Sequence, residues 1–263
     1  MRIVVCVKEV LDPAAVNNFA LAGGLKMGAD GKTPEVAAIP RLINGFDEQA
    51  LEAALRLRDA GIDCRITAVT IGAGDAPAML RQCAALGADE IVAIDAGARA
   101  LDGAAVAAVL HAYITRSGGA DLVLCGRQAS DDDQGVVPLL LAEKLGCAVT
   151  TLARDIQCAG GVLTVTRATP DGDEVVRGAL PALVTVSNEL GAPRFPTAKA
   201  KMAARKMAAE AVAIDSLGLD AAALEPRVVL TRQYVPQIQG NCEFLSGSPE
   251  QIAQALMERI RAA

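Results

Sequence analysis

The chain has 263 residues, of which 52% are apolar and 21% are charged, and this length suits one large domain or two small ones. Such a chain can bury a substantial core without disulfides or metal ions. The net charge of −6, the absence of Trp and the aromatic content of 2% argue against a nucleic-acid-binding protein, which usually has a basic surface and base-stacking side chains.

The sequence contains neither a clear targeting signal nor a metal-binding pattern. The first residues, MRIVVCVKEV, lack the features of a signal or transit peptide, so we expect a cytoplasmic protein. No apolar run approaches the roughly 20 residues that span a bilayer, so we do not expect a membrane protein. The seven Cys form no CxxC pair, and the single His, His111, lies in a helical pattern, which argues against a metal site or a catalytic triad.

The N-terminal segments predict a buried strand, an irregular excursion and a helix. Arg2–Val7 is almost continuously apolar, which is typical of a strand in a parallel sheet covered on both faces. Pro13–Pro40 is rich in Gly, Pro and Asn and is expected to be irregular, with a possible hairpin at Asp30-Gly31. Asn44 is expected to cap a helix over Asp47–Asp59.

Strands and helices then alternate as far as residue 145. This rhythm predicts an α/β fold with a doubly wound, mostly parallel sheet. The expected elements are strand Ile66–Ile71, helix Pro77–Leu86, strand Glu90–Ile94, helix Gly103–Arg116, strand Asp121–Cys125 and helix Val136–Leu145.

The pattern changes in the last part of the chain. Thr150–Val186 reads as strands joined by Gly160-Gly161 and Asp171-Gly172, which predicts an antiparallel hairpin extension of the sheet. Ala208–Tyr234 has little periodicity and is expected to be a linker, and its part Ala208–Leu230 is expected to lie on a partner chain rather than on its own domain. The final helix is expected to begin at Ser248-Pro249-Glu250-Gln251, a capping-box pattern.

The stretch GRQASDDDQGVVP, Gly126 to Pro138, carries the clearest chemical signal. It leaves a buried strand and enters a helix, whose free N–H groups can hold a phosphate, and Gly135 permits a close backbone approach. The alternative is an Asp-capped junction between loop and helix. Asn44–Asp47 is a second candidate, for an adenine, although the segment taken alone favours a simple N-cap. Neither GxGxxG nor a P-loop is present.

A basic segment stands out in this acidic chain. Arg194, Lys199, Lys201, Arg205 and Lys206 follow Pro193 within a short stretch that also holds Pro196. Such a segment is either a docking site for an acidic partner surface or a solvated helix face.

Several of these motifs together resemble the beta subunit of electron transfer flavoprotein over nearly the whole chain. The matching stretches are VCVKEVLDP (Val5–Pro13), LINGFDEQALEAALRLRD (Leu42–Asp59), GRQASDDDQG (Gly126–Gly135) and NELGAPRFPTAKAKMAARK (Asn188–Lys206). The order of the GxQAxDxD element and the later PR[FY]PT element is specific to this family.

The resemblance implies an adenine nucleotide alpha hydrolase-like, Rossmann-like domain over residues 1–190. Residues 191–263 would form a docking loop and a C-terminal arm that packs on an alpha subunit holding most of the FAD. The beta subunit would bind AMP or, in electron-bifurcating members, a second FAD. It would be an electron carrier rather than an enzyme. Its further partners would be a donor dehydrogenase and a membrane-bound quinone oxidoreductase or another acceptor.

Carried over residue by residue, the resemblance implies two sets of site residues. The cofactor-binding residues would be Cys6, Asn44, Gly45, Phe46, Asp47, Ile71, Ala129, Ser130, Asp131, Asp132, Asp133, Gln134, Gly135, Val136 and Val137, with no metal ligand. The partner-docking residues would be Arg194, Phe195, Ala198, Lys199, Lys201 and Arg205.

Two departures from the family pattern leave alternatives open. Gly135-Val136-Val137 stands where AMP-binding members often have Asn-Gln-Thr, and the loop also differs from the usual bifurcating pattern, so AMP and a second FAD both remain possible. Ala198 stands where many members have a Leu anchor, which favours a different redox partner. A stand-alone regulatory module of universal-stress type is the alternative function, although such modules usually end near the sheet.

Overall fold

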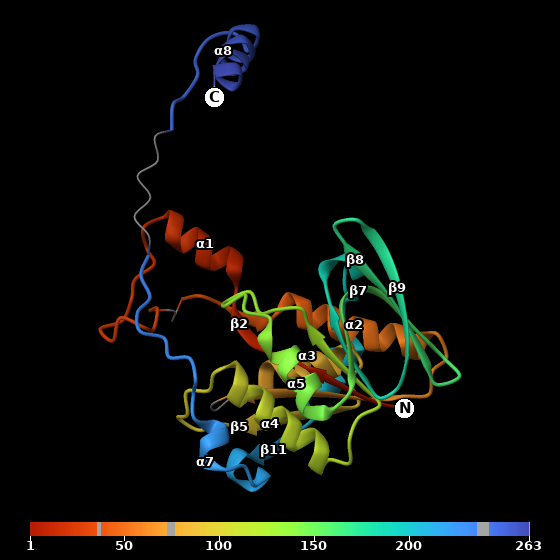
Figure 1. Cartoon of the computed structure of the whole chain (residues 1–263). Helices are drawn as coiled ribbons and strands as arrows, with labels where there is room; N and C mark the ends of the chain where they lie inside the picture. Colours follow the sequence, from red (N-terminus) through yellow and green to blue (C-terminus); the bar gives the residue numbers. More distant parts are fainter. Residues whose placement is uncertain (36–37, 73–76, 236–241, 263) are drawn as a thin grey trace. The chain divides into compact units, whose positions relative to one another are not determined.

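A computed structural model describes residues 1–35, 38–72, 77–235 and 242–262 of the chain (Figure 1). The chain divides into two compact units. The larger unit comprises Met1–Leu25 and Val36–Thr231, and the smaller one comprises Lys26–Glu35 and Arg232–Ala263.

The larger unit is built on a sheet that contains nine of the described strands, in the order β11-β5-β4-β1-β6-β10-β7-β8-β9. The pairs from β11 to β7 are parallel, and β7, β8 and β9 pair antiparallel. The predicted doubly wound, mostly parallel fold with an antiparallel extension is therefore confirmed. The strands are β1 Arg2–Cys6, β4 Arg65–Gly72, β5 Glu90–Asp95, β6 Leu122–Gly126, β7 Ala148–Ala159, β8 Val162–Thr169, β9 Gly172–Ala179, β10 Ala182–Val186 and β11 Glu210–Ala213.

Helices cover both faces of this sheet because successive side chains of each strand point to opposite faces. Ile3 and Val5 of β1 belong to the core beneath one set of helices, whereas Val4 and Cys6 belong to the core beneath the other set. The first set is α2 Gly45–Asp59 and α3 Pro77–Leu86, with α6 Ala198–Ala204 packed against α3. The second set is α4 Gly103–Arg116 and α5 Val136–Leu145, with α7 Ala221–Leu224 packed against α4.

The sheet order reverses between β1 and β6. From β1 the chain builds outward through β4 and β5 on one side and then returns to β6 beside β1. On the other side it forms β7, β8 and β9 before β10 fills the position between β6 and β7. Cys6 and Cys125 lie opposite each other in register at the carboxyl ends of these two strands. In open α/β sheets, ligands bind at such a switch point, beyond the carboxyl ends of the strands.

The expectation that Ala208–Tyr234 is a linker is wrong for its first part. Glu210–Ala213 forms β11 on the edge of the sheet beside β5, and a 3₁₀ turn over Ile214–Leu217 follows. Ile214 and Leu217 are buried in the core of the same unit, so this part does not depend on a partner for burial. The four residues of β11 are too few to show a strand period, and only the free edge of β5 specifies their conformation.

The excursion over Pro13–Pro40 also contains more order than expected. Pro13–Leu21 is helix α1, begun by Asp12, whose side chain accepts a hydrogen bond from the N–H of Ala14. Asp12-Pro13 is an N-cap followed by Pro at the first helical position, a signal that the high Gly and Pro content of the segment obscured. The strands β2 Glu9–Leu11 and β3 Arg41–Ile43 form a separate antiparallel pair on either side of the excursion.

The smaller unit contains two predicted features. The hairpin expected at Asp30-Gly31 is present as a turn closed by an isolated antiparallel bridge between Met27 and Pro34. Asp30 accepts hydrogen bonds from the N–H groups of Lys32 and Thr33, and Gly31 has a φ of 62°. The final helix, α8 Pro249–Ala262, begins as predicted. Ser248 and Gln251 form a reciprocal capping box, with a distance of 2.8 Å from the Ser248 N–H nitrogen to Gln251 Oε1. Within the described residues, no helix is both long enough and apolar enough to cross a membrane.

Candidate functional site

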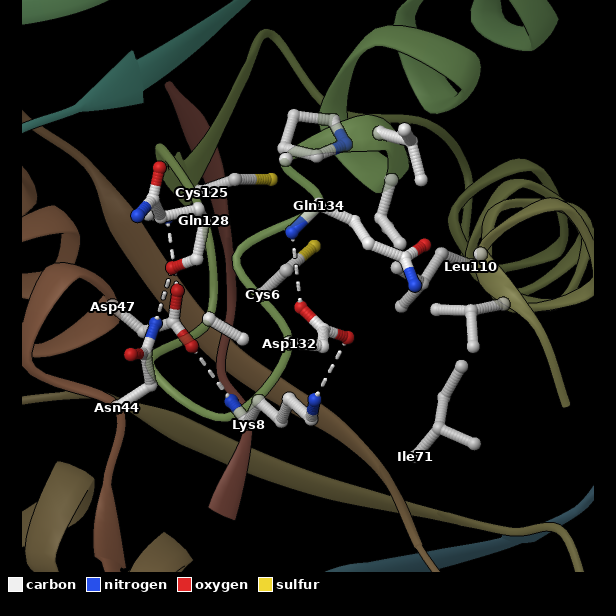
Figure 2. A pocket seen from close by; sticks show the side chains of 18 of the residues that line it. Cys6, Lys8, Asn44, Asp47, Ile71, Leu110, Cys125, Gln128, Asp132 and Gln134 are labelled. Atoms are coloured by element: carbon white, nitrogen blue, oxygen red, sulfur yellow. Dashed lines mark hydrogen bonds and ion pairs between the residues drawn. The ribbon is translucent and has the colours of Figure 1, made fainter. Parts of the chain in front are cut away.

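A cavity of about 260 Å³ lies beyond the carboxyl ends of β1 and β6, at the switch point of the sheet (Figure 2). Its walls come from these strand ends, the end of β4, the start of α2, the loop that follows β6 and the first turns of α4 and α5. Ten of the predicted cofactor-binding residues line it: Cys6, Asn44, Asp47, Ile71, Ala129, Asp132, Gln134, Gly135, Val136 and Val137.

Five predicted residues do not line this cavity but lie around it. Gly45 begins α2, and Phe46 lies beneath the guanidinium of Arg127, 5.4 Å from the ring centre. Ser130, Asp131 and Asp133 belong to the loop after β6, where they form hydrogen bonds or an ion pair within the chain. Among the described residues, no group of three or more His, Cys, Asp or Glu is arranged to hold a metal ion.

The predicted site residues leave out several residues that line the cavity. Lys8 and Gly126 begin segments beyond the carboxyl ends of the two central strands, where ligands bind, but neither is among the predicted cofactor-binding residues. The apolar residues near the start of α4 gave no such signal, because only the packing of α4 against α5 brings them here. The additional lining residues are Val7, Lys8, Val69, Leu101, Asp102, Gly103, Val106, Leu110, Cys125, Gly126, Gln128 and Pro138.

Asp47 joins the ends of the two central strands. Its Oδ2 accepts a hydrogen bond of 2.8 Å from the N–H of Lys8, and its Oδ1 accepts one of 2.9 Å from the N–H of Gly126. A Cβ at Gly126 would lie 2.4 Å from Asp47 Oδ1, so only Gly allows this approach. Asp47 thus fixes the point at which the loop leaves β6.

Asn44 fixes the next part of the same loop. It stands at the N-cap position of α2, but its side chain makes no capping hydrogen bond. Instead its Nδ2 donates to the carbonyl oxygen of Gln128 over 2.8 Å (Figure 2). Its Oδ1 accepts from the N–H of Ser130 over 3.2 Å. The predicted side-chain cap is therefore not formed, because the Asn44 amide bonds to the loop instead of to the first N–H groups of α2.

The three consecutive aspartates are held by partners within the site. Lys8 Nζ lies 2.6 Å from Asp131 Oδ1 and 3.4 Å from Asp132 Oδ2. Asp133, at a positive φ of 52°, accepts a hydrogen bond of 2.8 Å from Gln128 Nε2. The positive charge of Lys8 partly offsets the acidic charge at the cavity mouth, which would otherwise oppose an anionic ligand.

The N-terminus of α5 supplies the anion-binding potential of the cavity. Gly135 adopts a left-handed conformation with a φ of 63°, and a Cβ there would lie 2.9 Å from the carbonyl oxygen of Arg127. The cavity-lining residues Val136 and Val137 begin the helix, where backbone N–H groups have no partner within the helix. Free N–H groups and the positive end of the helix dipole together suit a phosphate.

Burial changes the protonation chemistry at the floor of the cavity. Burial raises the pKa of Asp47 to about 7, although hydrogen bonds from Lys8, Asn44 and Gly126 act in the opposite direction. A hydrogen bond with Cys6, followed by burial, raises the pKa of Cys125 well above its ordinary value. Both thiols are buried in the core, and the side chains of Ile71 and Leu110 line another wall of the cavity (Figure 2).

The predicted docking residues separate into two groups. Arg194 is bound within the chain, with its guanidinium 2.7 Å from Glu52 Oε2 and 2.6 Å from Asp59 Oδ2. Burial alone would raise the pKa of Glu52, but the hydrogen bonds from Arg194 and Arg56 outweigh it and leave the pKa lowered. Phe195, Ala198, Lys199, Lys201 and Arg205 are all exposed, and Phe195 retains 93% of its accessible surface.

Comparison with known proteins identifies the family. The family model described as "Electron transfer flavoprotein domain" matches residues 36–217. The chain belongs to the electron transfer flavoprotein family. It is 36% identical to electron transfer flavoprotein subunit beta of Megasphaera elsdenii, over 78% of this chain and 75% of that protein. The resemblance to the electron transfer flavoprotein beta subunit is therefore confirmed.

Two further relatives show the range of electron transfer flavoprotein complexes that contain such chains. Electron transfer flavoprotein subunit beta of Thermoanaerobacterium thermosaccharolyticum is 30% identical over 100% of this chain and 98% of that protein. Caffeyl-CoA reductase-Etf complex subunit CarD of Acetobacterium woodii is 37% identical over 74% of this chain and 71% of that protein. Relatives of this chain are therefore named as subunits of electron transfer flavoproteins and of a reductase-Etf complex.

Proposed function

We propose that this chain is the beta subunit of a heterodimeric electron transfer flavoprotein whose alpha subunit carries most of the FAD. The complex would take electrons from a donor dehydrogenase and deliver them to a quinone oxidoreductase or another acceptor. Family membership supports the electron-transfer role, and the relatives are electron-transfer subunits rather than catalysts.

The beta subunit would hold an adenine nucleotide in the cavity between β1, β6 and α5. The observation that supports this most strongly is the convergence of Gly135, the free N–H groups of α5 and a shaped loop on a cavity at the switch point. The phosphates would lie on Gly135–Val137, and the adenine would lie toward Cys6, Ile71 and the start of α2. The nucleotide would be AMP or the adenylate part of a second FAD.

Exposed side chains on α6 and α8 support the proposed contacts with other proteins. Lys199, Lys201 and Arg205 are exposed, and no carboxylate of a described residue lies within 4 Å of their side-chain nitrogens, so they can dock an acidic partner surface. On α8, Leu256, Met257 and Ile260 keep between 46% and 60% of their surface exposed. An amphipathic helix with an uncovered apolar face suits packing on the alpha subunit.

Copurification tests the proposal directly. The chain is produced together with its alpha subunit, and the nucleotides are released by denaturation and identified by mass spectrometry. One FAD and one AMP per heterodimer, or two FAD, would each agree with a nucleotide in the beta subunit. A stable heterodimer with one FAD and no second nucleotide would contradict the proposed use of the cavity.

A further inference from the structure

The loop that shapes the cavity is attached to the rest of the domain through few side chains. The Asp47 carboxylate accepts hydrogen bonds from the N–H groups of Lys8 and Gly126, at the carboxyl ends of two neighbouring strands. Asn44, one turn earlier, bonds to Gln128 and Ser130. The start of α2 therefore holds the loop at its origin and in its middle.

The two Asp47 oxygens face hydrogen-bond donors, which makes its ionised form the one that fits. A carboxylate accepts at both oxygens, whereas a carboxylic acid carries a proton on one of them. That proton would point toward an N–H group instead of toward an acceptor, so one of the two bonds would be lost. The Gly126 N–H lies 2.9 Å from Asp47 Oδ1, so loss of this bond would free the loop at its origin.

We propose that Asp47 is a positioning residue whose ionised carboxylate keeps the Gly126–Gly135 loop in its nucleotide-binding shape and whose protonation releases that loop. The inference rests on the proposed nucleotide-binding function and adds a proton-controlled step to it. Asp47 acts through the backbone, since its carboxylate accepts hydrogen bonds from the N–H groups at the ends of β1 and β6.

The surroundings of Asp47 allow its protonation near neutral pH. Burial raises the pKa of Asp47 to about 7. The charged groups near it are the Lys8 ammonium at the end of β1 and the half-buried Glu48 on α2, and Arg127 lies over Phe46 beside it. Cys125 on β6 and Cys83 on α3 interact with Asp47, and burial raises the pKa of Cys83 to about 12, so this thiol stays neutral.

The test compares AMP and FAD binding to the full chain at pH 6 and pH 8 by calorimetry. If only the ionised form holds the loop, a pKa near 7 gives about a tenfold weaker affinity at pH 6 than at pH 8. Asp47→Asn removes this titration and should weaken nucleotide binding. The remaining pH dependence of the variant's affinity should come only from titration of the ligand phosphate. That contribution is common to all variants, and it cancels in the ratio of wild-type to variant affinity.

Two further variants separate the positioning role from a general loss of structure. Glu48→Gln makes the same charge change one residue away, on a side chain that bonds to Gln82 and not to the loop, and it should keep the wild-type pH profile. Asn44→Ala should weaken nucleotide binding while keeping the pH dependence, because Asp47 remains. A wild-type pH profile in Asp47→Asn would overturn the proposal.

Hydrogen exchange of the ligand-free chain tests the same step without a nucleotide. Protection factors, which correct for the intrinsic effect of pH, should fall about tenfold at the Lys8 and Gly126 amides between pH 8 and pH 6 in the wild type. Equal protection at both pH values would refute the release of the loop. If the protection changes as expected but neither AMP nor FAD binds, the proposed function fails while the control of the loop by Asp47 stands.

Discussion

Arg194 binds Glu52 through two guanidinium nitrogens, with Nε 2.7 Å from Oε2 and Nη2 3.3 Å from Oε1. The backbone N–H of Arg194 also donates to Glu52 Oε2, over 3.2 Å. The pair joins α2 to the segment just before α6, although 142 residues separate them in the sequence. Arg194 therefore fixes the base of the proposed docking segment and is not itself available to a partner in this conformation.

Replacing Arg194 should destabilise the fold. Arg194→Met leaves the nearly buried Glu52 carboxylate with Arg56 as its remaining cation, at 3.0 Å. Losing one partner of such a pair should lower the free energy of unfolding by about 1–3 kcal/mol, less than for a fully buried pair because Arg194 is partly exposed. Urea unfolding measures this. The double variant Glu52→Gln/Arg194→Met should recover part of the lost stability. A free energy of unfolding for Arg194→Met equal to that of the wild type would contradict the structural role.

The exposed lysines of α6 should govern docking of the electron donor. Lys199→Glu/Lys201→Glu should slow electron delivery and flatten its salt dependence, because electrostatic attraction mainly raises the association rate and is screened over about 8–10 Å. Flavin content should not change. Stopped-flow reduction at two salt concentrations measures the effect, with Lys144→Glu/Arg177→Glu as a control for charge reversal elsewhere. Equal rates in wild type and the α6 variant would exclude this surface from docking.

The left-handed glycines at the two ends of α5 form a matched pair for testing phosphate binding. Gly135→Leu should abolish nucleotide retention, because its Cβ would lie 2.9 Å from the Arg127 carbonyl oxygen and its side chain would obstruct the helix start. Gly146 has nearly the same φ, 62° against 63°, but a Cβ there meets no atom within 4 Å. Gly146→Leu should therefore carry a similar backbone cost and keep the nucleotide. Nucleotide content after gel filtration distinguishes them, and full occupancy in Gly135→Leu would refute the placement.

Unfolding exposes Asp47 to water, whereas the proposed release of the loop removes its hydrogen bonds and leaves it buried, so the two processes depend on pH in opposite directions. For the whole fold, Asp47 should lower the stability as the pH rises. The folded protein binds this proton more tightly than the unfolded chain, since the pKa is about 7 instead of 3.8. The free energy of unfolding should therefore fall between about pH 4 and pH 7, by at most about 4 kcal/mol. Urea unfolding at pH 5 and pH 8 tests this, and Asp47→Asn should remove that part of the pH dependence. A wild-type stability that rises over this range would contradict the direction of the shift.

The C-terminal part of the chain should show two levels of protection from trypsin. Residues 210–224 pack on their own domain through Ile214 and Leu217, so they should resist cleavage even in the isolated chain. Arg232 is exposed, as are Val228 and Val229 just before it, so the isolated chain should be cut there. Binding of the alpha subunit should suppress this cut. An isolated chain that resists cleavage at Arg232 would argue against an arm that needs a partner.

The local sequence determined most of the secondary structure of this protein. The apolar run of β1, the Gly160-Gly161 turn and the Ser248 capping box each depend on neighbours within a few residues, so a sequence pattern is sufficient to predict them. The stretch Gly126–Pro138 likewise predicted a loop entering a helix, which the structure contains. The alternation of strands and helices was enough to predict the doubly wound sheet.

Tertiary structure alone decided which distant residues meet. Asp47 can join two strands only because β1 and β6 are neighbours in the sheet, and no local pattern carries that order. The same holds for β11, which needs the edge of β5, and for Leu110, which the packing of α4 beside α5 brings to the cavity. Hydrogen bonds and burial at such positions arise from chain segments tens to more than a hundred residues apart, so their partners become known only when the chain is folded.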